Sequence, residues 1–365
     1  MSVDFSREVH CLLGLPFDAI DLAGASRRVQ LAVTARKPYF LTTPNLTFLI
    51  GCLSDEKFRD SVIHSDLSVA DGMPLVWISR WLKMPIPERV AGSTLFEMWR
   101  NDLSSRMSVF FFGGPDGVAE AACRKLTAEK RGITCAGFES PGFGSLDDMS
   151  RQDLIARINA SNADFLLVAL GAKKGQAWIE RNRSHLNVPV ISHLGAVVNF
   201  VAGSVKRAPV WMQKVGLEWL WRILEEPALW RRYFDDGLAL GKILVTHTLP
   251  HAWFLRRYSP RAADIAAAGI EVKPEAGAYE LELRGAWLRE NIAPLRMAFT
   301  AAVESGKDIH LDLRAVPYVD SAFLGLTLLL FGHQRQLGKR LQIANVQPAV
   351  RRVMDYSQAK YLLGN

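Results

Sequence analysis

One acidic residue follows a short apolar segment, at a place where a carboxylate can act as a general base. Asp71 comes directly after Leu67 to Ala70, and Pro74 occupies the expected first turn of a helix. A carboxylate there can accept a proton from a sugar hydroxyl. Asp-Gly is also a common turn, so a structural role is the more frequent explanation of this segment taken alone.

The elements that would position Asp71 form an alternating pattern. Up to about residue 203, short β-branched or aromatic segments alternate with helical patterns, which predicts an α/β fold: a Rossmann-like, mostly parallel sheet with helices on both faces. Ligands of such sheets bind beyond the carboxyl ends of the strands, so we expect the chemistry there. The predicted strands are 39–42, 67–70, 109–112, 165–170 and 188–193.

Charge and tryptophan content single out a later segment. The 365-residue chain has a formal net charge of +7, which indicates an anionic partner such as nucleic acid, acidic lipid or a phosphate-bearing substrate. Residues 204–258 combine clustered Lys and Arg with Trp211, Trp219, Trp221, Trp230 and Trp253. This mixture fits a helical appendage at a membrane surface or active-site lid, and equally a helical pair packed on the core. Polar residues interrupt 238–255, so we do not expect that segment to cross a membrane.

Two further features concern the cellular setting. The N-terminus lacks the layout of a secretory signal, which predicts a cytoplasmic protein. The four cysteines, Cys11, Cys52, Cys123 and Cys135, lie far apart without metal-ligand spacing, and we expect them to be reduced and structural.

The pattern restarts near the C-terminus. Residues 259–278 are rich in Ala, Gly and Pro and are expected to form a linker. The following strands (279–284, 309–313, 341–345) and helices (291–305, 323–337, 348–356) predict a small α/β domain. The predicted organisation is therefore a core at 1–203, an appendage at 204–258, a linker at 259–278 and a second domain at 279–365.

Several strings resemble the WecG/TagA/CpsF glycosyltransferases over about residues 10–235. They are LTTPN (41–45), VADGMPLVW (69–77), ERVAGS (88–93), FFFGGP (110–115), GSVKRAPVWMQKVGLEWLWRILEEP (203–227) and LWRRY (229–233). The resemblance implies a GT-E-like fold and transfer of a sugar from a UDP-sugar to an undecaprenyl-diphosphate-linked sugar. It also implies inversion, no metal or other cofactor, a peripheral location on the inner face of the bacterial membrane, and a role in surface polysaccharide synthesis.

The same resemblance assigns site residues. It implies that Asp71 is the catalytic base, that Thr43 is a polar residue of the catalytic site and that Asn45 is a polar substrate-binding residue, although Thr43 and Asn45 also suit helix capping. Arg89 matches the arginine of the family's RVxG motif, and a surface ion pair is its alternative role. The chain has no Asp-x-Asp motif for a metal-held diphosphate, so arginines and the Gly-rich turn would replace the metal. The expected substrate-binding residues are Asn45, Arg89, Gly92, Ser93, Gly113, Gly114, Gly171, Lys174, Gln176, Arg207, Arg222, Arg231 and Arg232.

The chain departs from the family pattern at two places. GAKKGQA (171–177) replaces the usual GxPKQE, and Thr94 replaces the usual Asp after RVxGS. Gln176 is placed to substitute for the family glutamine, and Lys173 or Lys174 to add phosphate contacts. A catalytically degenerate nucleotide-sugar sensor or scaffold is therefore the alternative to an active enzyme.

The C-terminal domain resembles STAS domains over about residues 279–363. The string DLRAVPYVDSAFLGL (312–326) carries the resemblance, and Ser321 matches a serine that many members phosphorylate. A helix cap is the alternative role of Ser321. Phe323 replaces a small residue on the surface where partners usually dock, which favours Phe323 as a hydrophobic anchor for a protein partner. We expect regulation through a kinase or partner, self-association is compatible with the short sheet edges, and no nucleic-acid-binding motif is present.

Overall fold

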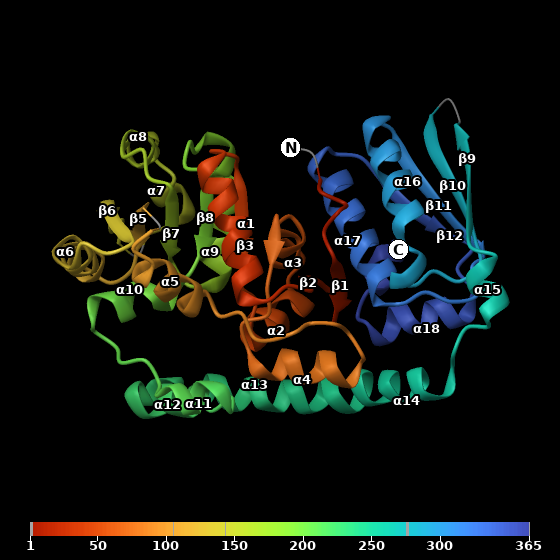
Figure 1. The fold of residues 1–365 in the computed structure, drawn as a ribbon, viewed down its shortest axis with the longest axis horizontal. Helices are drawn as coiled ribbons and strands as arrows, with labels where there is room; N and C mark the ends of the chain where they lie inside the picture. The colour runs from red at the N-terminus through yellow and green to blue at the C-terminus, as the bar shows by residue number, and fades with distance from the viewer. Residues whose placement is uncertain (1–2, 105, 143, 275–276, 365) are drawn as a thin grey trace. The chain divides into compact units, whose positions relative to one another are not determined.

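The computed structural model describes residues 3–104, 106–142, 144–274 and 277–364 (Figure 1). The chain divides into two compact units. The six-stranded unit comprises Ile20–Val76 and Pro87–Gly237, and the four-stranded unit comprises Met1–Ala19, Trp77–Ile86 and Leu238–Asn365. The first nineteen residues, which we expected in the core at 1–203, therefore group with the C-terminal part of the chain.

The six-stranded unit contains a parallel sheet in the order β4-β3-β8-β7-β5-β6. Its strands are β3 (Tyr39–Thr42), β4 (Leu67–Ser68), β5 (Met107–Gly113), β6 (Ile133–Glu139), β7 (Phe165–Ala169) and β8 (Val190–His193). Its helices are α1 (Leu22–Thr34), α2 (Leu46–Ser54), α3 (Glu56–Ile63), α5 (Gly92–Asn101), α6 (Val118–Glu129), α7 (Leu146–Met149), α8 (Gln152–Ala160), α9 (Ala172–Asn182) and α10 (Gly195–Ala202). Helix α4 (Met73–Trp81) begins in this unit and ends in the other.

Helices cover both faces of this sheet, as predicted. Alternate residues of β5 point to opposite faces. Phe111 belongs to an apolar cluster with α1, α5, α6 and α10, whereas Phe110 and Phe112 belong to one with α7, α8 and α9. Because both faces are buried, the central strands β5 and β7 are nearly continuous apolar runs, which is typical of parallel sheets.

The basic appendage consists of helices whose tryptophans lie largely at the surface. These helices are α11 (Val210–Lys214), α12 (Glu218–Glu225) and α13 (Trp230–Ile243), with a 3-10 turn at Pro227–Leu229. Trp211, Trp219 and Trp230 are 61%, 46% and 52% exposed. The appendage therefore does not bury these three tryptophans in the core, contrary to the alternative of a helical pair packed on the core.

The chain continues from α13 through a π-helical segment (Leu244–Thr248) into α14 (Leu249–Arg257). Pro250 lies in the first turn of α14, and because proline has no N–H to donate, the preceding turn widens. No helix among the described residues is both long enough and apolar enough to span a bilayer.

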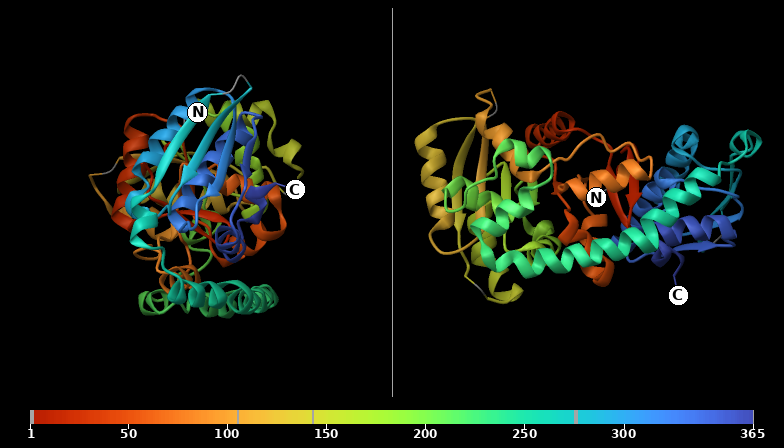
Figure 2. Two further views of the ribbon diagram at one scale, coloured as in Figure 1. Left: turned by 90° about the vertical axis from the view of Figure 1, so that its right-hand side faces the viewer. Right: turned by 90° about the horizontal axis from the view of Figure 1, so that it is seen from below.

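The four-stranded unit contains a sheet in the order β12-β11-β10-β9, whose strands run side by side in the left view of Figure 2. Its strands are β9 (Gly269–Pro274), β10 (Ala278–Arg284), β11 (Asp308–Ala315) and β12 (Leu341–Ala344). Its helices are α15 (Ala262–Ala266), α16 (Ala293–Glu304), α17 (Ser321–Gln336) and α18 (Pro348–Tyr356), with 3-10 turns at Arg289–Asn291 and Lys360–Leu363. Strand β9 pairs antiparallel with β10, and the other pairs are parallel.

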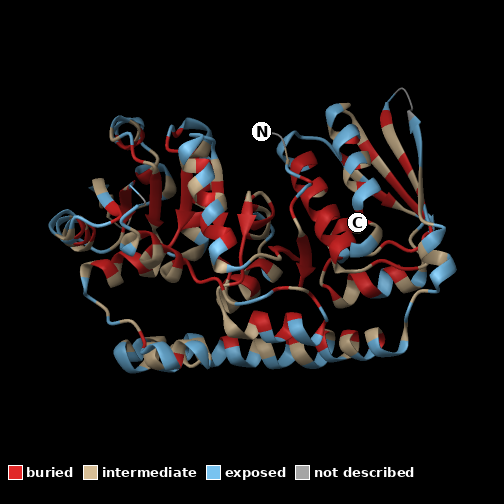
Figure 3. Cartoon of the chain, in the orientation of Figure 1, coloured by how far each residue is buried: buried red, intermediate tan, exposed pale blue. Residues whose placement is uncertain are grey.

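This unit differs from expectation at its beginning. The segment 259–278, expected as a linker, contains α15 and β9, although residues 275–276 lie outside the described part. An N-terminal hairpin of β1 (Val9–Leu12) and β2 (Leu15–Asp18) also belongs to the unit. Figure 3 shows that α17 is buried along most of its length.

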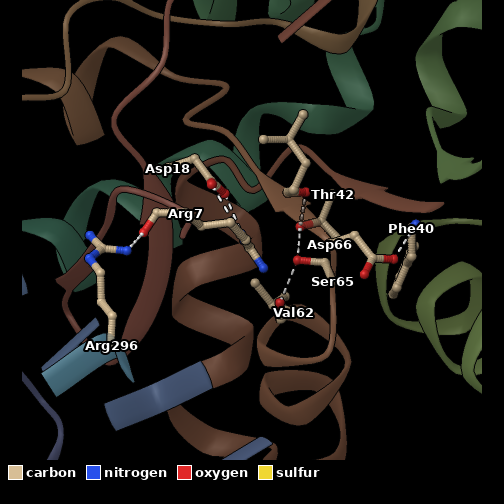
Figure 4. A network of polar contacts seen from close by, with 9 residues as sticks. Arg7, Asp18, Phe40, Thr42, Val62, Ser65, Asp66 and Arg296 are labelled. Atoms are coloured by element: carbon tan, nitrogen blue, oxygen red, sulfur yellow. Dashed lines mark hydrogen bonds and ion pairs between the residues drawn. The ribbon is translucent and has the colours of Figure 1, made fainter. Parts of the chain in front are cut away.

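Buried polar contacts fix strand positions within each unit (Figure 4). In the four-stranded unit, Arg7 forms two hydrogen bonds with Asp18, at 3.1 and 2.7 Å, which tie the two ends of the hairpin together. In the six-stranded unit, Thr42 donates to Ser65 at 3.1 Å and so ties β3 to the loop before β4. The Arg7–Asp18 pair is bidentate and charge-assisted, which makes it the stronger of these two contacts.

One cysteine expectation is corrected. Cys123 of α6 and Cys135 of β6 form a disulfide in the structure, with their Cα atoms 5.2 Å apart. Cys11 and Cys52 are free and buried, as expected of structural cysteines.

Candidate active site

Asp71 lies beyond the carboxyl end of β4, held by backbone hydrogen bonds to neighbouring segments. Its amide donates to the Pro44 carbonyl at 2.9 Å, and the Val90 amide donates to the Ala70 carbonyl at 2.9 Å. The Gly92 amide, at the start of α5, lies 3.4 Å from an Asp71 carboxylate oxygen. The carboxyl group therefore lies between the ends of two strands and the N-terminus of a helix, where a negative charge is favoured.

Burial dominates the electrostatics of Asp71 and raises its pKa to about 6. The charge of Glu218 acts in the same direction, while Arg89, the Gly92 amide and Arg207 lower the pKa. The residue itself is only half-buried. A carboxylate with a pKa near neutrality and some access to solvent has the properties of a general base.

Arg89 is engaged with a residue of the appendage. Its guanidinium donates to Glu218 at 2.8 Å, and both side chains are largely buried. The pair is therefore largely buried, unlike the surface ion pair considered from the sequence, and both of its charges act on Asp71. Since a guanidinium carries five N–H donors, this pairing leaves donors for an anion.

Arg207 precedes α11 in the chain and, like Arg89, lowers the pKa of Asp71. Its guanidinium donates to the Thr94 hydroxyl at 2.6 Å. Desolvation lowers the pKa of Arg207, and Glu218 and Asp71 oppose that effect. Thr94, where the family usually has Asp, thus gives Arg207 a neutral partner, which leaves the positive charge available to a ligand.

Thr43 and Asn45 follow β3 and lie near these groups. A Cβ atom on Gly92 would be 3.3 Å from the Thr43 hydroxyl and 2.3 Å from Leu194, so only glycine permits this approach of α5. The Asn45 side chain accepts from the Phe48 amide at 3.1 Å and caps α2. Asn45 also lies beside Gly72, and Ser93 follows Gly92 in the first turn of α5.

The glycine-rich turns lie after β5 and β7. Gly113 and Gly114 have φ of 94° and 89°, and the Gly114 amide donates to the Ala169 carbonyl at 2.8 Å. That amide is therefore used within the protein in this structure. Gly171 precedes α9 with φ of 80°, a value that L side chains rarely adopt.

The polar side chains of the GAKKGQA loop (171–177) lie in different environments. Lys173 forms an exposed ion pair with Asp55, and Lys174 donates to the Gly144 carbonyl, both at 2.5 Å. Gln176 is buried, and within the described residues neither atom of its side-chain amide has a hydrogen-bond partner. A buried amide without partners is costly, so Gln176 is the residue of this loop that has hydrogen-bonding capacity to offer a ligand.

Two site residues were not found from the sequence. Glu218 lies in the GLEW string. It pairs with Arg89, which is 129 positions away in the sequence, so no local pattern indicates the contact. His193 ends β8, and its ring lies against Gly175, where a Cβ atom would be 2.3 Å away. Burial lowers the pKa of His193 to about 4, so the ring is neutral. Its position at a strand end, like that of Asp71, is the signal that could have identified it.

The remaining predicted arginines, Arg222, Arg231 and Arg232, lie on the appendage. Arg222 lies over the Phe200 ring at 5.1 Å, and Arg232 over the Tyr233 ring at 5.0 Å. Arg231 is exposed and lies over the exposed Trp230 at 5.5 Å. These pairs present cations together with aromatic surface.

A potential metal-ligand cluster in the described residues lies in the other unit. It consists of Glu280, Glu282 and Asp312. Lys273 pairs with Glu282 at 2.7 Å, and Arg314 and Asn345 donate to Asp312 at 2.6 and 2.7 Å. These partners already neutralise or satisfy two of the three carboxylates, those of Glu282 and Asp312, so the cluster does not identify a metal centre.

The C-terminal site residue Ser321 begins α17, and its hydroxyl lies 2.9 Å from Nδ1 of His10. Asp320, rather than Ser321, caps the helix by accepting from the amides of Ala322 and Phe323. Phe323 is 1% exposed. The hypothesis that Phe323 is an exposed anchor for a partner is therefore wrong, because its side chain lies in the core.

A parallel sheet with helices on both faces and polar groups gathered at its carboxyl edge has the architecture in which α/β enzymes bind their ligands. The chain belongs to the glycosyl transferase WecG/TagA/CpsF family, whose model matches residues 10–251. Residues 271–363 match the family model described as "Mlab, STAS domain". Both resemblances noted from the sequence are thereby confirmed.

Several known relatives align with somewhat more than half of the chain. A protein of Bacillus spizizenii named N-acetylglucosaminyldiphosphoundecaprenol N-acetyl-beta-D-mannosaminyltransferase is 28% identical over 197 residues, covering 54% of this chain and 75% of that protein. Proteins with the same name from Bacillus subtilis and Staphylococcus aureus are 28% and 25% identical, covering 53% and 60% of this chain and 73% and 85% of theirs. A solved structure described as "The overall structure of SLC26A9" matches with a TM-score of 0.20 and 10% identity, over 78% of this chain and 53% of that one, too low to support an argument.

Proposed function

We propose that this protein is an inverting, metal-independent glycosyltransferase that moves a sugar from a UDP-sugar to a polyprenyl-diphosphate-linked sugar during synthesis of a bacterial surface polysaccharide. The observation that carries the proposal is Asp71, a half-buried carboxyl group with a pKa of about 6 beside Arg89 and Arg207. The names of the relatives, which specify a diphosphoundecaprenol-linked acceptor, support the acceptor class.

The proposed reaction is a single displacement. Asp71 accepts the proton of the acceptor hydroxyl while the oxygen of that hydroxyl bonds to the anomeric carbon of the donor. The bond from that carbon to the diphosphate oxygen breaks, and the electron pair leaves with UDP. Attack opposite the leaving group inverts the anomeric configuration.

Arg207 and Arg89 take the part that a metal ion plays in other transferases. Their guanidinium groups can form paired hydrogen bonds with the departing diphosphate and stabilise the charge that develops on it. Because Thr94, the hydrogen-bond partner of Arg207, is neutral, it does not offset the positive charge of the guanidinium. The Gln176 amide supplies further hydrogen bonds to the donor.

A lipid-linked acceptor requires a membrane surface, which the appendage is suited to bind. The exposed Trp211, Trp219 and Trp230 fit the boundary between headgroups and acyl chains, and Arg231 and Arg232 fit anionic headgroups. We therefore place the protein peripherally on the inner face of the cell membrane, with the STAS module in a regulatory role.

The test is transfer by Asp71→Asn compared with the native protein and with Asp153→Asn, an exposed carboxylate on α8 of the same unit. Asp71→Asn should retain UDP-sugar binding, and UDP release with a polyprenyl-diphosphate-sugar acceptor should fall by about a hundred-fold or more. Asp153→Asn should match the native protein. Near-native turnover by Asp71→Asn would remove the base assignment.

The second candidate function is a nucleotide-sugar sensor, favoured by the GAKKGQA loop and by the engagement of Arg89 with Glu218. The same experiment separates the two functions. A native protein that binds the donor but releases no UDP with any lipid-linked acceptor would support the sensor.

A further inference from the structure

The N-terminal hairpin, residues 5–18, packs entirely within the unit that contains the STAS match. Strands β1 and β2 pair only with one another in the described sheets, through a two-residue turn at Leu13 and Gly14. Every residue from Val9 to Asp18 is nevertheless buried. A two-stranded hairpin is marginally stable alone, so its burial against other elements must supply its stability.

Helix α17 provides the main surface for the hairpin. Gly325 lies against the backbone of β1, where a Cβ atom would be 2.4 Å from the Val9 carbonyl oxygen. One helical turn earlier, Ser321 shares a hydrogen bond of 2.9 Å with His10. Residues four apart lie on one face of a helix, so β1 covers the face of α17 that carries Ser321.

Side chains at both ends of the hairpin hold it in place. Arg296 of α16 donates to the carbonyls of Phe5 and Arg7, the latter at 2.6 Å, and Arg289 pairs with Glu8. At the turn, the Tyr361 hydroxyl donates to the Gly14 carbonyl at 2.6 Å. These contacts use backbone carbonyls of the hairpin, as a peptide-binding surface does.

We infer that residues 5–18 are an internal ligand of the STAS module, which occupies the α17 surface and shields Ser321 from partners and modifying enzymes until the hairpin is released. His10 is buried and its ring contacts the Ser321 hydroxyl directly, so a bulky or charged group on Ser321 cannot fit while the hairpin is docked. Only Ala19, Ile20 and Asp21 separate β2 from α1 of the six-stranded unit. Release of the hairpin would thus free the segment that leads directly into the transferase.

Cys11 offers a direct measure of release. It lies in β1, is completely buried, and burial raises its pKa to about 12. Cys52 of α2 is a free buried cysteine in the six-stranded unit and serves as the internal reference. A thiol reacts as its thiolate and only when exposed, so the alkylation rate at Cys11 reports the fraction of released hairpin.

The decisive variant of the full-length chain is Gly325→Ala, which adds a methyl group against Val9 while raising the helix propensity of α17. Gly241→Ala in α13 is the matched control, because no atom lies within 4 Å of the added Cβ. We expect Gly325→Ala to raise iodoacetamide labelling of Cys11, read by mass spectrometry, by about ten-fold or more with Cys52 unchanged. Ser321→Glu should act likewise, and Ser321→Ala should not.

Three results would overturn the inference. Cys11 could remain as protected in Gly325→Ala and Ser321→Glu as in the native protein. Cys11 and Cys52 could become reactive together, which would make the hairpin an inseparable part of the fold. A dimer with protected Cys11, seen by light scattering, would assign the surface to the hairpin of a second copy.

Discussion

The pKa of Asp71 predicts how transfer depends on pH. Because the base must be ionised, kcat/KM for the native protein should fall about ten-fold per pH unit below an inflection near pH 6. Glu218→Gln should move that inflection to lower pH, since it removes a charge that raises the pKa and frees Arg89, which lowers it. A pH–rate profile of both proteins checks this prediction, and an inflection that stays in place in Glu218→Gln would contradict it.

Thr94 positions Arg207 through a single hydroxyl group, so removing that hydroxyl tests whether the contact matters for donor binding. Thr94→Val removes the acceptor at 2.6 Å, and we expect the KM for the donor to rise about ten-fold with a smaller change in kcat. Thr94→Ser keeps the hydroxyl and should behave like the native protein. Equal KM values in the two variants would show that Arg207 is held by other contacts.

The start of helix α5 depends on a glycine that allows close packing. Gly92→Ala should destabilise the six-stranded unit by about 1–3 kcal/mol, because the new methyl group would overlap Leu194. Gly237→Ala, in α13 with open space around the added Cβ, is the control and should be neutral or slightly stabilising. Urea unfolding measures both, and equal midpoints would contradict the packing argument.

The appendage helices should bind anionic membranes through exposed cations and tryptophans. Replacing Arg231 and Arg232 with Glu should reduce flotation with anionic liposomes, and more strongly at low salt, where screening is weakest. Replacing the exposed Arg124 and Arg151 with Glu, both far from the appendage in sequence, makes the same change in net charge and is the control. Flotation that is unchanged by the double substitution would assign the tryptophans another role.

The sequence predicted those parts of the molecule whose signals are local. Helix α18 was predicted with its observed bounds, because Pro348 marks its first turn, and the strand ends that surround Asp71 followed from apolar runs and turn residues. Strand β9 was missed because its surroundings are rich in Ala, Gly and Pro. The contact of His10 with Ser321 joins residues 311 positions apart, and the pair of Cys123 with Cys135 depends on how α6 packs on β6. Such pairings arise from tertiary packing, which no local pattern encodes.

Three of the buried histidines, His10, His193 and His251, link the stability of the molecule to acid. Burial lowers the pKa of each to about 4, whereas an unfolded chain has values near 6.5. The unfolded state therefore binds more protons between these values, so stability is fully present above about pH 6.5 and is lost as pH falls toward 4, by up to about 3 kcal/mol per histidine. Asp71 and Asp320, whose pKa values are raised by burial, act in the opposite direction.

Urea unfolding at pH 7 and pH 4.5 should therefore give a lower midpoint at the acid pH. His251→Gln should reduce that difference, because a neutral amide does not titrate, whereas replacement of the exposed His185 by Gln should leave it unchanged. The two units contain different histidines, His10 and His251 in one and His193 in the other. If His251→Gln lost as much stability on acidification as the native protein, burial of this neutral ring would not contribute to the acid sensitivity of its unit.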